Sequence, residues 1–388
     1  MNKQIVTNFI DTDLYKLSMM QAVFHQYPNA KVRWEFKCRN KGVELGFIKN
    51  ELNEQVKSWD NLRITKKEAN YLRTIPFFTE DFIQFLENDF CLDSNRIYIE
   101  NVGGDLVIEA MGTWLDTIWY EVPLLATVNE LYFDNFDDNL KYMNAERILR
   151  NKLHLIKDYP TFKYAEFGTR RRFSKYWQEQ ALQIQMEMVP NNLVGVSNVK
   201  LAMDYNLKPI GTVAHEWTMA HLGIVDNISQ AQKRALHVWQ QEYGQKLGIA
   251  LTDTFTSDAF FRDFDFNLAR GYDGIRHDSG CPFEFGEKAI KHWESIGIDP
   301  RRKSVVFSDG LNFPLALDIW RRFIGRTGVS FGIGTNITND FDGVKALAIV
   351  MKLLECNDQS CIKLSDDKGK NMGDPRMIEK VKKAYRVK

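Results

Sequence analysis

The chain has 388 residues, of which 44% are hydrophobic and 26% charged, and its 51 Lys and Arg residues balance 51 Asp and Glu residues. This is the composition of an ordinary globular protein of two or three domains. The balanced charge excludes an overall field that would attract nucleic acid or an anionic membrane, so we expect neither as a partner.

Cellular location and cysteine chemistry point the same way. The segment 1–13 contains no apolar core of signal-peptide length, and no run of about 18 apolar residues occurs anywhere in the chain. The five cysteines show no C-x-x-C pairing, which favours neither a disulfide framework nor a structural zinc site. We therefore expect a cytoplasmic protein with reduced thiols.

The first predicted helix covers residues 11–24, where apolar side chains recur at helical spacing. Asp11 or Thr12 is its expected N-cap. Tyr15 falls beside the apolar stripe, and the pattern alone makes it a half-buried surface aromatic residue. The segment thus predicts an amphipathic helix with one buried face.

Short strands and helices alternate irregularly up to about residue 160. Residues 31–37 alternate as a strand does, residues 79–90 are helical, and residues 121–132 form the firmest helix, with Pro123 near its first turn. No cluster of catalytic side chains occurs in this part. We interpret residues 1–160 as an N-terminal α+β domain that covers the rest of the protein.

From residue 161 onward, short apolar runs alternate with amphipathic helical segments. There are seven such runs, and each ends in a polar residue. The first begins at Phe162, and the other six cover 193–197, 209–216, 248–254, 274–280, 304–310 and 329–335. This pattern predicts an α/β fold, an irregular β/α barrel over 161–345 whose site lies at the carboxyl ends of the strands. A doubly wound open sheet is the alternative, although its glycine-rich phosphate motifs are missing. Residues 346–388 are expected to pack back on the barrel or on the N-terminal domain.

The segment 209–217 is the centre of the predicted site, with His215 near its end. We expect a short buried strand there, followed by a polar loop. A histidine in such a loop can act as a base, a ligand or a nucleophile, or it can merely hydrogen-bond a neighbouring loop. The functional interpretation is favoured by the other polar residues that end the runs, namely Arg170, Arg171, Arg172, Thr212, Asp253, Arg276, His277, Asp278, Ser279, Asp309, Gly332, Gly334 and Thr335.

Two stretches are suited to phosphate binding. Three consecutive arginines, 170–172, follow Gly168 and Thr169 at the start of a helix, where guanidinium groups and free backbone N–H groups can hold a phosphate. A solvated basic face is the alternative for such a triplet. The run 332–335 offers a second, weaker phosphate cradle late in the barrel.

Three carboxylates, Asp253, Asp278 and Asp309, stand at separate strand ends. They can hold Mg²⁺ through water or bind sugar hydroxyls, and each can alternatively cap a helix. Together with the cations they suit a substrate with a monophosphate at one end and a magnesium-bound diphosphate at the other. Displacement at a phosphorylated ribose requires such a site, because charge builds up on the departing pyrophosphate.

The motifs that contain these residues resemble those of the nicotinate phosphoribosyltransferase family, in the same order and over essentially the whole chain. They are Asp11-Thr-Asp-Leu-Tyr-Lys-Leu-Ser-Met-Met-Gln21, Phe167-Gly-Thr-Arg-Arg-Arg-Phe-Ser174, Gly211-Thr-Val-Ala-His-Glu-Trp217, Arg276-His-Asp-Ser-Gly280, Phe307-Ser-Asp309, Phe331-Gly-Ile-Gly-Thr335, and Lys363-Leu-Ser365 with Gly369-Lys370.

The resemblance implies a type II phosphoribosyltransferase fold and a specific reaction. Such an enzyme forms nicotinate mononucleotide and pyrophosphate from nicotinate and phosphoribosyl pyrophosphate, a step of NAD salvage. It implies Mg²⁺ and ATP, whose hydrolysis is coupled through a phosphorylated histidine that matches His215. It also implies a homodimer in which Tyr15 can act in the partner's site.

The resemblance further assigns roles to single residues. His215 and Asp278 become the catalytic residues, and Asp278 and Asp309 the Mg²⁺ residues, acting through water. Tyr15 and Phe167 would flank the pyridine ring. The remaining substrate-binding residues would be Thr212 and Arg276 near nicotinate, Arg170 and Thr335 on phosphoribosyl pyrophosphate, and Gly168, Ser279, Asp309 and Gly334.

One residue departs from the pattern of the family. An acidic residue usually follows Asp-Ser-Gly, and here the position is Cys281. We interpret the missing carboxylate as a helix cap rather than a metal ligand, since Asp278 is retained. An exposed thiol near arginines could also be sensitive to oxidants.

Four other interpretations are less favoured. A nicotinamide phosphoribosyltransferase is usually longer, and a quinolinate phosphoribosyltransferase is shorter and uses no phosphohistidine. A metal hydrolase is disfavoured because His215 and His277 lack the i, i+4 spacing of a helical metal site. An inactive barrel kept as a binding protein is disfavoured by the intact His215, Arg276 and Asp278.

Overall fold

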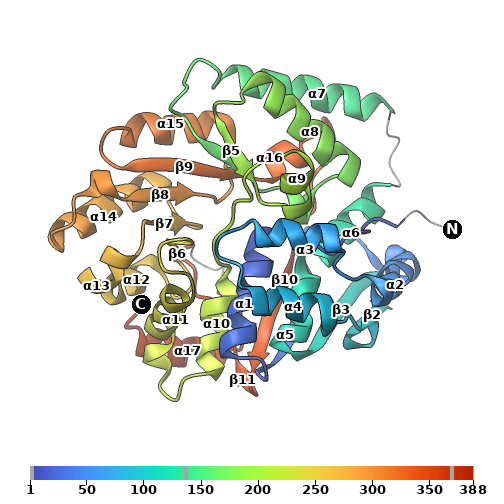
Figure 1. Cartoon of the computed structure of the whole chain (residues 1–388), viewed down its shortest axis with the longest axis horizontal. Coiled ribbons are helices and arrows are strands. Elements are labelled where there is room, and N and C mark those ends of the chain that lie inside the picture. Colours follow the sequence, from blue (N-terminus) through green and yellow to red (C-terminus); the bar gives the residue numbers. More distant parts are fainter. Residues whose placement is uncertain (1–3, 135–138, 368–370, 388) are drawn as a thin grey trace.

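The protein is built around two β-sheets, seen in Figure 1, in a computed structural model that describes residues 4–134, 139–367 and 371–387. One sheet has five strands in the order β11-β10-β1-β3-β2, and the other has six in the order β5-β4-β9-β8-β7-β6. Gly369 and Lys370, part of one motif, lie outside the described residues. No helix in the described ranges is long and apolar enough to cross a membrane.

The five-stranded sheet is antiparallel and joins the two ends of the chain. Its central strand β1 has alternating buried and open residues, with Val32, Trp34 and Phe36 facing inward, as the sequence predicts for a half-buried strand. The strands and helices of this part are β1 (Lys31–Cys38), β2 (Ile97–Val102), β3 (Asp105–Thr113), α1 (Leu14–Gln26), α2 (Lys49–Ser58), α3 (Lys66–Arg73), α4 (Glu80–Asn88), α5 (Trp114–Thr117), α6 (Glu121–Phe133) and α7 (Asn139–His154).

Helix α1 is buried on all sides, not on one stripe as expected. Its residues from Leu14 to Val23 are all buried, and Tyr15 is only 8% exposed, so the prediction of a half-buried surface tyrosine is wrong. Asp13, rather than Asp11 or Thr12, holds the N-cap position. The cause is that the helix lies between the antiparallel sheet and the barrel: Lys16, for example, contacts side chains of α6 and α10 (His215–Ala220).

The C-terminal segment returns to the N-terminal part of the molecule. Strand β10 (Ile349–Cys356) pairs with β1, and the short strand β11 (Gln359–Ser360) extends the same sheet. Helix α17 (Pro375–Ala384) packs through Met377 and Val381 into a small second core. The boundaries near residues 160 and 345 stay predictions, but two strands of the N-terminal sheet come from the end of the chain.

The six-stranded sheet is parallel, and helices cover it (Figure 1). This is the irregular β/α barrel that the alternating pattern predicts. Its elements are β4 (Tyr164–Glu166), α8 (Lys175–Met188), β5 (Leu193–Val196), α9 (Val199–Asp204), α11 (Ala231–Tyr243), β6 (Ile249–Leu251), α12 (Ser257–Asp263), α13 (Phe266–Gly271), β7 (Gly274–His277), α14 (Pro282–Ser295), β8 (Ser304–Phe307), α15 (Phe313–Phe323), β9 (Gly328–Ile333) and α16 (Thr335–Thr338).

One of the seven predicted runs, residues 209–216, is not a strand. It keeps a single bridge, between Pro209 and Val196, and then leaves the sheet. A Cβ on Gly211 would lie 2.9 Å from the backbone nitrogen of Tyr15, so this segment runs directly against the start of α1. Contact with α1 takes the place of strand pairing, and His215 becomes the first residue of helix α10 instead of the end of a strand.

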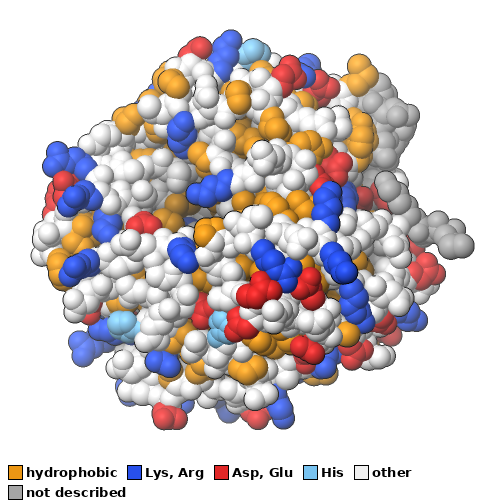
Figure 2. Space-filling view, viewed as in Figure 1, with side chains coloured by type: hydrophobic (Ala, Val, Ile, Leu, Met, Phe, Trp, Pro, Cys, Tyr) orange, Lys and Arg blue, Asp and Glu red, His pale blue; other side chains and the backbone are white. Residues whose placement is uncertain are grey.

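Charged side chains are mixed on the surface. Figure 2 shows Lys and Arg interspersed with Asp and Glu over the face in view, without a continuous patch of either sign. The balance of the composition therefore holds locally on this face. Concentrated charge occurs inside the cavity described next.

Candidate active site

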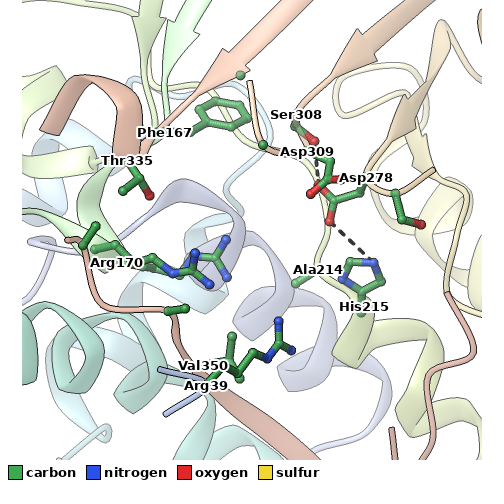
Figure 3. Close-up of a pocket in the computed structure, with 18 of the residues that line it drawn as sticks. Arg39, Phe167, Arg170, Ala214, His215, Asp278, Ser308, Asp309, Thr335 and Val350 are labelled. Atoms are coloured by element: carbon green, nitrogen blue, oxygen red, sulfur yellow. Dashed lines mark hydrogen bonds and ion pairs between the residues drawn. The ribbon is translucent and has the colours of Figure 1, made fainter. Parts of the chain in front are cut away.

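A cavity of about 760 Å³ lies between the carboxyl ends of the barrel strands and strand β10. Figure 3 shows side chains from both sides converging on it. Ten of the twelve residues to which the resemblance assigns a role line this one cavity, namely Phe167, Gly168, Arg170, His215, Arg276, Asp278, Ser279, Asp309, Gly334 and Thr335.

Tyr15 and Thr212, also predicted for the site, do not line the cavity. Tyr15 lies behind Arg170 of its own chain, with the guanidinium carbon 5.8 Å from the centre of its ring, and its hydroxyl donates to Glu121 at 3.4 Å. The hydroxyl of Thr212 is buried and has no hydrogen-bond partner among the described residues. Tyr15 thus supports the cavity wall from behind, through Arg170 and Glu121.

The arginine triplet divides between binding and structure. Strand β4 leads into a short 3-10 helix, Thr169–Arg171, which directs Arg170 and Arg171 to the cavity. Arg172 points the other way, where it is 1% exposed and pairs with Asp11 at 3.1 Å. Burial and the neighbouring Arg170 and Arg39 lower the pKa of Arg171 to about 10. Arg170 and Arg171 are thus available to an anion. Arg172 instead forms a buried ion pair, which neither of the two interpretations, phosphate binding or a solvated basic face, predicted.

The second predicted phosphate-binding stretch, 332–335, lies directly against the loop that follows β4. Strand β9 ends at Ile333, and Gly334 precedes the one-turn helix α16. A Cβ on Gly332 would lie 2.3 Å from the ring of Phe167, and one on Gly334 would lie 2.7 Å from the carbonyl oxygen of Phe167. Only glycine permits this approach, which places the loops after β4 and β9 side by side.

His215 is held at one ring nitrogen. Its Nε2 lies 2.8 Å from a carboxylate oxygen of Asp253, 2.8 Å from the Nζ of Lys363 and 3.6 Å from Asp278. In Figure 3 the other nitrogen, Nδ1, faces the open side of the cavity. The imidazole is therefore oriented from behind and presents Nδ1 to whatever occupies the cavity.

Asp253 is the fixed point behind His215. Its carboxylate is 1% exposed and accepts hydrogen bonds from Ser279 at 2.7 Å and from Lys363 at 2.8 Å at the oxygen that His215 does not use. Burial would raise its pKa, but the adjacent His215 and Lys363 outweigh burial and hold the pKa well below its usual range. The carboxylate stays ionised at neutral pH.

Asp278, which is partly buried with a side chain 18% exposed, forms a second anchor. One of its oxygens accepts hydrogen bonds from Arg276 at 2.8 Å and Ser308 at 2.7 Å. Despite burial, Arg276 and His215 lower the pKa of Asp278 to about 2. Arg276 uses Nε and one terminal nitrogen for Ser308 and Asp278, and its other terminal nitrogen has no hydrogen bond to a described residue.

The structure adds residues for which the sequence predicted no role. Lys363 belongs to one of the resembling motifs, but only the folded chain shows that its side chain reaches His215. Backbone hydrogen bonds from Lys363 to Met372 and from Leu364 to Thr254 hold this segment beside the cavity. Lys16, Glu121 and Glu216 form a buried ion cluster beside the cavity. The available signals were that Lys16 and Glu216 lie within resembling motifs and that Glu216 directly follows His215.

His215, Asp253 and Asp278 also form a set of potential metal ligands whose donor atoms lie within 4.8 Å of one another. Asp253 is already neutralised by Lys363, and one oxygen of Asp278 by Arg276. Among the described residues, the other oxygen of Asp278 makes only the long contact to His215. The donors thus fit a cation bound through water at Asp278 better than a cation coordinated directly by the triad.

Cys281, where the resembling pattern has an acidic residue, is exposed and does not line the cavity. It holds the N-cap position of α14 and forms no side-chain cap hydrogen bond. A carboxylate at this position would serve as a helix cap, which supports the structural interpretation of the departure. Its sensitivity to oxidants stays a prediction.

Glu166, buried at the end of β4, leads to a prediction about pH. Its carboxyl accepts hydrogen bonds from Gln178 and from the backbone of Gly168, and burial raises its pKa from 4.5 to about 7. Between these pH values the folded protein keeps a proton that the unfolded chain releases, so this group's contribution to stability is lost as pH rises through about 7. We expect the free energy of unfolding of the wild type to fall relative to that of Glu166→Gln, which has no carboxyl group to ionise, from pH ~5 to pH ~8 in urea titrations. A difference that stays constant over that range would contradict it.

The irregular β/α barrel, with cations, carboxylates and an oriented histidine at its strand ends, agrees with the type II phosphoribosyltransferase fold that the resemblance implies. The sequence patterns described as the "Nicotinate phosphoribosyltransferase (NAPRTase) family" and its "N-terminal domain" match residues 162–388 and 10–129. The chain belongs to the nicotinate phosphoribosyltransferase family.

Individual relatives agree with this assignment. The chain is 44% identical to the nicotinate phosphoribosyltransferase of Ectopseudomonas mendocina, over 99% of this chain and 98% of that protein. It is also 44% identical to that of Burkholderia mallei, over 96% and 94%. The crystal structure of the enzyme from Porphyromonas gingivalis superposes with a TM-score of 0.94 at 33% identity, covering 99% of this chain and 100% of the other. That of the Vibrio cholerae enzyme gives 0.94 at 35% identity, covering 100% and 95%.

Proposed function

We propose that the protein forms nicotinate mononucleotide and pyrophosphate from nicotinate and phosphoribosyl pyrophosphate, coupled to ATP hydrolysis through a phosphohistidine at His215, as a step of NAD salvage. The observation that carries the coupled part is the clamp on His215: the buried carboxylate of Asp253 accepts the Nε2–H of His215 at one oxygen and pairs with Lys363 at the other. Family membership supports the transfer reaction.

The clamp selects the nucleophilic nitrogen. A neutral imidazole carries one proton, and an Nε2–H that donates to Asp253 leaves the lone pair on Nδ1. Attack by Nδ1 on the γ-phosphorus of ATP forms an N–P bond and breaks the bond to the leaving oxygen of ADP. Asp253 then stabilises the positive charge that the imidazole gains, and Lys363 stays paired with the other carboxylate oxygen.

The opposite wall of the cavity suits the other substrates. Arg170 and Arg171, with the backbone around Gly334 and Thr335, offer charge and N–H groups to the phosphates of phosphoribosyl pyrophosphate. Phe167 offers a flat face on which a pyridine ring can stack. These groups bind and orient the substrates so that the ring nitrogen approaches the anomeric carbon as pyrophosphate leaves.

Mg²⁺ completes the proposal as the counter-ion of the departing diphosphate. The free oxygen of Asp278 and the carboxylate of Asp309, both at the cavity surface, would hold it through water. The protein residues do not depend on the ion for their own arrangement, since Asp278 is fixed by Arg276 and Ser308.

Arg276 is the residue we assign to the nicotinate carboxylate. Its unpaired terminal nitrogen can donate to that carboxylate, whereas a neutral amide would gain less from a cation. We expect Arg276→Ala to lower kcat/KM for nicotinate by about tenfold or more. Unchanged steady-state kinetics with nicotinate would remove this role.

A homodimer is also part of the proposal. Since Tyr15 already lies behind Arg170 of its own chain, we assign its support of the cavity to the same subunit. Light scattering would give the mass in solution. A monomer with full activity would remove the dimer from the account.

The function as a whole is tested by pyrophosphate release from phosphoribosyl pyrophosphate and Mg²⁺, with nicotinate or nicotinamide as the acceptor, each with and without ATP. We expect release with nicotinate, increased by ATP. Release with nicotinamide but not with nicotinate would overturn the assignment of nicotinate as the acceptor. No release with either acceptor would indicate a binding protein instead of an enzyme.

A further inference from the structure

A buried lysine connects two walls of the cavity. Lys16, on helix α1, has a side chain that is 0% exposed, and its ammonium group pairs with Glu121 at 2.5 Å and with Glu216. The ring of Trp34 lies 5.0 Å from the same nitrogen. A lysine is rarely buried this completely, and removal of an ion from water is costly unless the ion is well paired.

Each of the two carboxylates belongs to a different functional wall. Glu121 also accepts from Arg170 at 3.4 Å, the arginine that lines the proposed phosphoribosyl pyrophosphate side. Glu216 directly follows His215 in helix α10 and accepts from the indole N–H of Trp114 at 3.3 Å. Both carboxylates line the cavity. The series of ion pairs Arg170–Glu121–Lys16–Glu216 thus ends beside His215.

The charges along this series of ion pairs are interdependent. Glu121 and Glu216 share Lys16, and only Arg170 provides a second cation to either in the ion pairs of the described residues. If Arg170 turns to a substrate anion, Glu121 loses a partner and binds Lys16 more strongly. The ion pair between Glu216 and Lys16 then weakens, and the start of helix α10, which carries His215, changes position. Coupling of this kind acts in both directions, because it is a free energy shared by two sites.

We propose that Lys16 is a positioning residue that couples occupation of the Arg170 side of the cavity to the placement of His215, so that the phosphate on His215 is discharged together with product formation rather than lost to water. This inference rests on the proposed phosphohistidine mechanism. It assigns Lys16, Glu121 and Glu216 no contact with the reacting atoms. Their role is to link the wall that carries Arg170 to the wall that carries His215.

The test compares the wild type with Lys16→Met and Glu216→Gln. The measured quantity is the ratio of ADP to pyrophosphate formed with ATP, nicotinate, phosphoribosyl pyrophosphate and Mg²⁺, together with ADP formed when phosphoribosyl pyrophosphate is left out. We expect the ratio to rise by roughly fivefold or more in both variants, because His215 is no longer restrained by the state of Arg170. A loss of general stability would lower both products together and leave the ratio unchanged.

Asp11→Asn is the matched control. It removes an equally buried carboxylate that pairs with Arg172 and does not line the cavity, so it lowers stability without disturbing the link. Its product ratio is expected to equal that of the wild type. Because Glu216→Gln keeps the shape of the side chain, it tests the inference even if Lys16→Met does not fold.

The outcomes separate the two claims. A wild type that forms ADP with product, with Glu216→Gln folded and at the wild-type ratio, would overturn the coupling role of Lys16 alone. A wild type that forms pyrophosphate but never ADP would overturn the phosphohistidine mechanism and this inference with it. A raised ratio in Glu216→Gln together with an equally raised ratio in Asp11→Asn would also overturn it, since any buried ion pair would then serve.

Discussion

Replacement of His215 by Asn is expected to reduce ADP formation by about a thousandfold or more, while pyrophosphate release without ATP persists within roughly tenfold of the wild type. The reason is that His215 lies across the cavity from the arginines that we assign to phosphoribosyl pyrophosphate. Asn keeps a polar side chain on α10 but supplies no nucleophilic nitrogen. The measurement is ADP and pyrophosphate from the same reaction mixtures.

His292→Asn is the control for this result. The His292 side chain donates one hydrogen bond, from Nε2 to the backbone carbonyl of Phe264, and does not line the cavity. Its ADP and pyrophosphate formation should match the wild type. ADP formation by His215→Asn at the wild-type rate would exclude His215 as the phosphorylated group.

The second large effect is expected from Asp253→Asn, which we predict to slow ADP formation by roughly 10²–10⁴-fold. The amide of asparagine can donate a hydrogen bond to Nε2 of His215, which favours the tautomer with the proton on Nδ1, the nitrogen that must attack. The variant also leaves Lys363, 14% exposed, without its carboxylate. We expect a stability loss of about 3–5 kcal/mol, measured by urea unfolding.

The kinetic and stability effects of Asp253→Asn can be separated with Asp263→Asn. Asp263 is a partly buried carboxyl that accepts a hydrogen bond from Gln232 outside the cavity. It should lower stability without slowing ADP formation. ADP formation by folded Asp253→Asn at the wild-type rate would show that the tautomer of His215 is not controlled by this carboxylate.

The barrel could be predicted because its strands are short, apolar and followed by polar residues. Six of the seven runs became parallel strands whose ends meet, and this brought Arg170, Arg276, Asp278 and Thr335 to one cavity. Local pattern was sufficient there, since a strand buried on both faces has a characteristic sequence.

The pattern failed where contacts between distant parts override local preference. The run that ends near His215 became a loop and a helix because it lies against α1. The burial of Lys16 could not be predicted either, because it depends on Glu121 and Glu216 far along the chain, and lysine is usually exposed. The meeting of Lys363 with Asp253 likewise follows from the return of the C-terminal segment.

The most direct test of the account is to incubate the protein with ATP labelled at the γ-phosphate and to locate the label by peptide mass spectrometry. We predict an acid-labile, alkali-stable phosphate on the peptide that contains His215, absent from His215→Asn and discharged when nicotinate and phosphoribosyl pyrophosphate are added. A protein that turns over ATP together with nicotinate but carries no label, or carries it on another residue, would contradict the phosphohistidine mechanism.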